Sequence, residues 1–123
     1  MFIREIMHKD IFSIDYESSI IDACKRFYRK QIGSLLVLED GKLKGIITER
    51  DIISKVIILN KDPNETYVSD IMSTEVITVN QDSKIEEAVR IMNEKNIKKL
   101  PVVSDTGKIV GIITTSDITK IIK

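Results

Sequence analysis

One short motif that occurs twice carries the residues best suited to hold a small polar ligand. The string Gly-Ile-Ile-Thr-x-x-Asp stands at residues 45–51 and again at residues 111–117. It ends an apolar strand and begins a helical pattern, where unpaired helix N–H groups favour an anion. Its carboxylate, Asp51 or Asp117, can accept from two adjacent hydroxyls, which suits a ribose 2′,3′-diol. Its hydroxyl, from Thr48 or Thr114, stands three residues earlier.

The same spacing also fits a purely local role. Thr-x-x-Asp is close to a capping box, in which the hydroxyl accepts from a helix N–H and the acid reaches back to the capping residue. The usual acid there is Glu or Gln, and Asp in a first helical turn is favourable without any ligand. From spacing alone, a helix cap and a ribose contact therefore both stay open for Asp51 and Asp117.

The motif is duplicated because the chain is duplicated. Residues 6–57 align with residues 71–123, and the one extra residue, Thr106, falls in a turn. Each copy reads as strand, helix, strand, strand, helix, and Ser83 to Glu86 has the form of a capping box. We predict an α/β (α+β) fold of two β-α-β-β-α repeats, packed about a pseudo-twofold axis because one copy alone would leave an apolar sheet face uncovered. The boundaries expected are repeat 1 at 1–59, a linker at 60–67 and repeat 2 at 68–123, with short lead-in segments at 2–7 and 68–72.

Composition limits the possible partners. There are 19 basic and 19 acidic residues, so the chain lacks the basic excess typical of nucleic-acid binding. Aromatic residues make up 5%, which predicts an aliphatic core. One cysteine, Cys24, and one histidine, His8, are too few for a disulfide or a zinc site. We expect Cys24 to be a buried filler, His8 to be a surface loop residue, and no metal site. No apolar run is long enough to span a bilayer and no signal-peptide pattern is present, so we expect a cytoplasmic protein.

The repeated order, the Leu-Pro-Val-Val strand at 100–103 and the closing Gly-Ile-Ile-Thr-x-x-Asp strings together resemble the CBS-domain pair, or Bateman module, over essentially the whole chain. The resemblance implies an adenine nucleotide as ligand. It places Asp51 and Asp117 on the ribose, and Thr48 and Thr114 near ribose or phosphate. It further implies that the first short strand of each copy lies near the adenine, in part through its backbone. The residues concerned are Ile14, Thr78 and Val79.

The two copies differ around the motif. The second has Lys98-Lys99 before its Leu-Pro, where the first has Gly33-Ser34. The first has Arg50 within the motif, where the second has Ser116. By the same resemblance, Lys99 and more weakly Lys98 are candidates to reach a phosphate; Arg50 could bind it in a bidentate manner and Ser116 could donate a hydroxyl. The alternative for these charges is a solvated surface. If they bind, the two sites differ in phosphate affinity.

The function that follows is a regulatory sensor of AMP, ADP, ATP or a related adenosyl compound such as S-adenosylmethionine, with no required cofactor and a possible regulated protein partner. We expect no enzyme, since the sequence shows no nucleophile–base pair, metal cluster or P-loop. The alternative is a ligand-free interaction module, because such pairs in the family usually form homodimers through their closing helices. The apolar positions available for either a core or a dimer contact there are Ile52, Ile53, Val56, Ile57, Ile118, Ile121 and Ile122.

Overall fold

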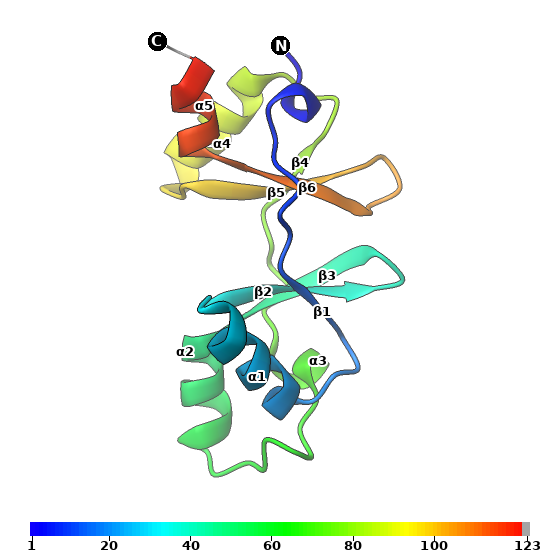
Figure 1. The fold of residues 1–123 in the computed structure, drawn as a ribbon, viewed down its shortest axis with the longest axis vertical. Helices are drawn as coiled ribbons and strands as arrows, with labels where there is room; N and C mark the ends of the chain where they lie inside the picture. Colours follow the sequence, from blue (N-terminus) through cyan, green and yellow to red (C-terminus); the bar gives the residue numbers. More distant parts are fainter. Residues whose placement is uncertain (122–123) are drawn as a thin grey trace. The chain divides into compact units, whose positions relative to one another are not determined.

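The computed structural model describes residues 1–121 and divides into two compact units. The first-repeat unit is Phe12–Val76, and the second-repeat unit combines Met1–Ile11 with the chain from Ile77 onward. Each unit contains a three-stranded sheet with its helices on one face (Figure 1). The mixed α and β fold of two repeats is confirmed; their packing about a pseudo-twofold axis stays a prediction. The elements are η1 (Ile3–Glu5), β1 (Ser13–Asp15), α1 (Ile20–Lys30), β2 (Ser34–Glu39), β3 (Lys42–Thr48), α2 (Glu49–Ile52), η2 (Ile53–Ile57), α3 (Val68–Ile71), β4 (Val79–Asn80), α4 (Ile85–Lys95), β5 (Lys99–Val103), β6 (Ile109–Thr114) and α5 (Thr115–Ile121).

Both sheets follow one topology. The first short strand pairs parallel with the second, and the second pairs antiparallel with the third, giving the orders β1-β2-β3 and β4-β5-β6. The β2–β3 hairpin turns through Asp40 and Gly41, both at positive φ, which is the backbone that a tight two-residue hairpin requires. Both hairpins end on the threonine of the repeated motif.

The core of each unit is aliphatic, as the composition predicts. In the first-repeat unit, Phe27 is the only aromatic side chain in the fully buried cluster. The second-repeat unit has no aromatic side chain in the corresponding cluster of the described residues. Alternate residues of the two hairpin strands supply the centre of each core, because successive side chains of a strand point to opposite faces. These residues are Leu35, Val37 and Ile47 in one unit, and Leu100, Val102 and Ile113 in the other.

The lead-in segments are exchanged between the repeats. The N-terminal segment (residues 1–11) packs in the second-repeat unit, where Ile3 is fully buried. Helix α3, which precedes the second repeat in sequence, packs in the first-repeat unit through Val68 and Ile71. The compact units therefore do not coincide with the stretches of sequence that form the repeats.

Backbone hydrogen bonds fix both exchanged segments in matching ways. Ile3 donates to Ser83 O at 2.9 Å, and Val68 donates to Ser18 O at 2.8 Å. The Met1 carbonyl accepts from Ile85 N at 3.1 Å, at the start of α4. The capping box predicted for Ser83 to Glu86 is therefore wrong: α4 begins at Ile85 without a side-chain cap, and the N-terminal segment supplies the acceptor instead.

Candidate functional site

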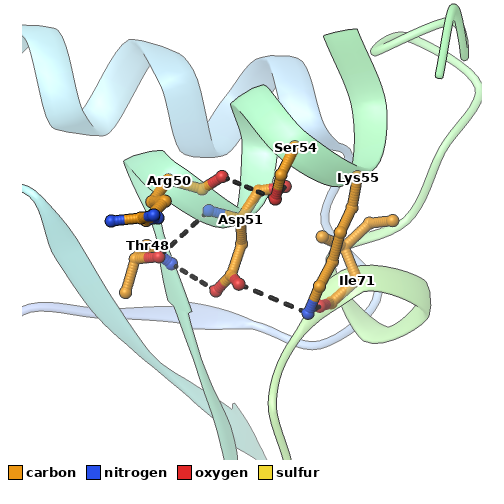
Figure 2. A network of polar contacts seen from close by, with 6 residues as sticks. All are labelled: Thr48, Arg50, Asp51, Ser54, Lys55 and Ile71. Carbon is orange, nitrogen blue, oxygen red and sulfur yellow. Dashed lines mark hydrogen bonds and ion pairs between the residues drawn. The ribbon is translucent and has the colours of Figure 1, made fainter. Parts of the chain in front are cut away.

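In the first-repeat unit, the repeated motif forms a closed hydrogen-bonded ring at the start of α2 (Figure 2). The Thr48 hydroxyl accepts from Asp51 N at 3.1 Å, and Asp51 Oδ2 accepts from Thr48 N at 3.0 Å. This is a capping box with Asp in place of Glu, so the helix-cap interpretation of the spacing is confirmed. The helical stretch of α2 has four residues and continues as the π-helical η2.

The second oxygen of Asp51 is also engaged. Lys55 Nζ lies 3.3 Å from Asp51 Oδ1, one turn along the same helix. The same ammonium donates to the Ile71 carbonyl at 3.3 Å, and Figure 2 shows it between the two oxygens. Because Ile71 belongs to the exchanged helix α3, Lys55 connects the motif carboxylate to the lead-in segment.

In the second-repeat unit, Asp117 closes the equivalent ring. Its Oδ2 accepts from Thr114 N at 2.9 Å and from the Thr114 hydroxyl at 3.0 Å, while that hydroxyl accepts from Asp117 N at 3.2 Å. A third contact comes from His8, whose Nδ1 lies 3.0 Å from the same Oδ2. No local sequence pattern indicates this pair, because the two residues are 109 positions apart.

The contacts around Asp117 favour its ionised form. Its partial burial opposes ionisation, but the bonds from the Thr114 N–H, the Thr114 hydroxyl and the His8 ring outweigh that cost, so the pKa of this carboxyl lies below its usual value. A charged carboxylate at the end of a strand accepts hydroxyl or amine donors and repels phosphate. Any phosphate of a bound ligand would therefore need cations other than the motif itself.

The glycine that opens each motif makes room for the exchanged segment. A Cβ on Gly111 would lie 2.9 Å from the His8 carbonyl oxygen and 2.6 Å from Met7 Sδ. A Cβ on Gly45 would lie 2.6 Å from the Ser73 carbonyl oxygen. The space that each glycine leaves is therefore occupied by the backbone of the exchanged segment.

Lys98 and Lys99 of the second-repeat unit lie at the same end of the sheet as Thr114. Lys99 is the ladder partner of Thr114, and the Lys98 carbonyl accepts from Thr115 N at 2.9 Å. Both lysine side chains are exposed and make no ion pair within residues 1–121. Ser116 is exposed on the first turn of α5.

Arg50 occupies the corresponding first turn in the first-repeat unit. It is exposed, and Figure 2 shows its side chain directed away from Lys55. Its carbonyl accepts from the Ser54 hydroxyl at 2.9 Å, while its guanidinium makes no ion pair with any described residue.

The first short strands contribute mainly to the core. Ile14 is 2% exposed and pairs with Val37, and Val79 is 4% exposed and pairs with Val102. Thr78, just before β4, is partly exposed. The side chains of Ile14 and Val79 therefore fill the core, and their backbone groups face the neighbouring strands β2 and β5.

Among residues 1–121, no group of three His, Cys, Asp or Glu side chains is arranged to hold a metal ion. None of the described helices is long and apolar enough to cross a membrane.

The fold and the duplicated motif together define the family. The CBS domain pattern matches residues 3–58 and 68–123, so the chain belongs to the CBS-domain family and carries two such domains. A relative, the protein MK0525 of Methanopyrus kandleri, is 37% identical over 97% of this chain. The chain spans 61% of that relative's length, and 37% of the length of MJ1232 from Methanocaldococcus jannaschii.

Several solved structures share the fold. Hypoxic Response Protein I with two coordinated zinc ions matches with a TM-score of 0.83, at 26% identity over 98% of each chain. The CBS domain pair of MJ0100, in complex with 5′-methylthioadenosine and S-adenosyl-L-methionine, matches with a TM-score of 0.74, at 31% identity over 100% of both chains. The cytosolic domain of the Mg²⁺ channel MgtE in complex with ATP matches with a TM-score of 0.78, at 28% identity over 95% of this chain and 47% of that one.

Proposed function

We propose that the protein is a regulatory module that binds an adenosine-type ligand at the Thr–Asp motif of each repeat. The observation that carries the proposal is the duplicated carboxylate of Asp51 and Asp117, each held ready to accept by its own threonine at a strand end. The complexes of MJ0100 with adenosyl compounds and of MgtE with ATP support this ligand class.

A ribose diol suits these carboxylates for a simple reason. A carboxylate has about four acceptor sites, and the internal cap bonds use only part of that capacity. The hydroxyls of a ribose are neutral donors, so they add to the ring of cap bonds without displacing it. Lys98 and Lys99 in one unit, and Arg50 in the other, are placed to attract phosphates.

Calorimetric titration with AMP, ADP, ATP and S-adenosylmethionine tests the proposal. We expect at least one of the four to bind, and Asp51→Ala and Asp117→Ala each to remove binding at one site. The matched control is Asp70→Ala, since Asp70 accepts from Tyr67 N at 3.3 Å as a cap of α3 outside the motif. If the motif variants weaken binding no more than Asp70→Ala does, Asp51 and Asp117 are helix caps alone.

We also propose that the protein does no chemistry on its ligand. The described residues near the motif are a threonine, a carboxylate already engaged as a cap, and exposed cations, with no activated nucleophile among them. Prolonged incubation with ATP and S-adenosylmethionine, followed by chromatography, should return both unchanged. Turnover that is lost in Asp51→Ala or Asp117→Ala would contradict this.

Self-association through the closing helices is a second function that one observation favours. Ile52 and Val56 are buried in the core, but Ile53 and Ile57 on the same stretch are 54% and 57% exposed. Ile58 and Leu59, which follow, are 71% and 59% exposed. Ile118 is buried and Ile121 is 44% exposed, while Ile122 lies outside the described residues.

An exposed apolar stripe of this kind fits a second copy of the chain as its partner. Sedimentation velocity should give a dimer for the unaltered protein and a monomer for Ile57→Glu. The matched control is Lys61→Glu, an exposed substitution just beyond the stripe. A monomer at all concentrations for the unaltered protein would rule out this use of the helix.

A further inference from the structure

The N-terminal segment brings a histidine to the second-repeat motif. His8 Nδ1 lies 3.0 Å from Asp117 Oδ2, an oxygen that also accepts from the N–H and the hydroxyl of Thr114. An ionised carboxylate only accepts, so Nδ1 carries the hydrogen of this bond. Three donors converge on one oxygen, while Oδ1 has no donor among residues 1–121.

The backbone holds the imidazole in place. His8 N donates to the Ile112 carbonyl at 3.0 Å, and Ile112 N donates to the His8 carbonyl at 2.9 Å, so His8 forms an added bridge on β6. Gly111 leaves the room for this approach, and Ile3 anchors the segment in the core. His8 is therefore fixed at the motif by main-chain pairing and does not reach it as a free surface side chain.

The first-repeat unit makes an equivalent connection with different chemistry. There Ser73 forms the bridge, to Ile46 on β3, and its side chain makes no hydrogen bond with a described residue. The motif carboxylate, Asp51, is held instead by Lys55, which also donates to the carbonyl of Ile71. In both units the motif carboxylate is thus tied to the exchanged lead-in segment.

We propose that His8 is a positioning residue of the second-repeat site, and that it couples occupancy of this site to docking of the N-terminal segment. This rests on the function proposed above. By saturating Oδ2, His8 and Thr114 fix the rotation of the Asp117 carboxylate and leave Oδ1 to accept from a ligand hydroxyl. A ligand on Oδ1 in turn favours the docked segment, because coupling between two binding events is reciprocal.

Affinity at the isolated second-repeat site tests the positioning role. In an Asp51→Ala background, AMP, ATP and S-adenosylmethionine are titrated as separate probes into the protein with His8, with His8→Ala and with His8→Asn. We expect His8→Ala to weaken binding about tenfold, in line with the loss of a hydrogen bond to a charged group. His8→Asn should restore affinity to within about threefold, since its amide nitrogen can donate from nearly the position of Nδ1.

Ser73, which occupies the position of His8 in the first-repeat unit, provides the control. Ser73→Ala in an Asp117→Ala background should leave affinity at the first-repeat site unchanged, since the Ser73 side chain is not bonded to Asp51. Equal weakening by His8→Ala and His8→Asn in folded protein would overturn the donor role of His8. If Asp51→Ala protein binds none of the probes, the proposed second-repeat site itself fails; if it binds them and His8→Ala changes nothing, only the present inference fails.

Amide hydrogen exchange tests the coupling. Saturating probe should slow exchange at His8 N and Ile112 N in the Asp51→Ala protein, because both amides bond across the N-terminal segment and β6. The slowing should be lost with His8→Ala and kept with His8→Asn. Slowing of equal size in His8→Ala would show that the ligand acts on the segment without His8 and would overturn the coupling.

Discussion

Gly111 lies next to the bridge between the N-terminal segment and β6, so replacing it with alanine tests how the segment is docked. The added Cβ would stand 2.6 Å from Met7 Sδ and 2.9 Å from the His8 carbonyl oxygen. The methionine side chain can turn aside. The carbonyl cannot, because it accepts from Ile112 N in the backbone bridge. The segment must therefore lift from the strand or distort it.

Two separate estimates, one from overpacking and one from lost hydrogen bonds, give the same expected loss in the free energy of unfolding. Forcing an extra methyl group into a packed site typically costs about 1–3 kcal/mol. Losing the two His8–Ile112 backbone bonds, at about 0.5–1.5 kcal/mol each, also sums to about 1–3 kcal/mol. We expect Gly111→Ala to lower the free energy of unfolding by that amount and Gly45→Ala, which meets the Ser73 carbonyl, to behave alike.

Urea denaturation followed by circular dichroism measures the change. Gly33→Ala is the matched control, because its Cβ would meet only the end of the exposed Glu49 side chain, 3.1 Å away. That variant should stay within about 0.5 kcal/mol of the parent or gain stability, since alanine restricts the unfolded chain. If Gly111→Ala is as stable as Gly33→Ala and its His8 and Ile112 amides remain protected from exchange, the segment docks without the space that Gly111 leaves.

Three further predictions follow from the packing and charges of the second-repeat unit. Ile3→Ala should cost about 2–5 kcal/mol in urea denaturation, since Ile3 is fully buried in a core built mainly from residues after 77; a cost below about 1 kcal/mol would place the segment outside that core. Asp117→Asn should destabilise the protein most near neutral pH. The folded pKa of Asp117 is lowered, so its contribution is complete above the unfolded value of about 4 and is lost as pH falls through the lower folded value; a gap between variant and parent that persists unchanged at pH 2 would contradict this. Lys99→Ala should weaken ATP binding at the second-repeat site several-fold at low salt and less at high salt, as measured by calorimetry in an Asp51→Ala background; equal weakening of adenosine would assign Lys99 a role other than phosphate attraction.

Local pattern was sufficient for helix α1, for the first hairpin turn and for the cap of the first motif. The stripe of Ile20, Ala23, Cys24 and Phe27 predicts α1. Ile20, Ala23 and Phe27 are buried, whereas Cys24, expected to be a buried filler, is only partly buried against the core. Asp40-Gly41 predicts a hairpin turn, and both residues adopt positive φ there. Thr48 and Asp51 form the capping box that their spacing allowed. Each of these features depends on residues close together in sequence, so the local sequence is enough to predict it.

Contacts between segments far apart in the chain could not be predicted from such local patterns. His8 reads as an isolated surface histidine, and only the docking of the N-terminal segment on β6 brings it to Asp117. The error at Ser83 has the same origin, because the acceptor that starts α4 is the Met1 carbonyl. Even the division of the closing helix needed the structure, which buries Val56 and exposes Ile57.

The sequence by itself determined the duplication, the order of strands and helices, the aliphatic character of the core and the two Thr–Asp motifs. Periodicity and turn chemistry act over a few residues, so a single chain displays them directly. Only the tertiary structure decided which lead-in segment completes which unit, and hence that Asp117 meets a histidine while Asp51 meets a lysine. That choice is made by main-chain pairing and burial between segments far apart in the chain, and these have no local pattern.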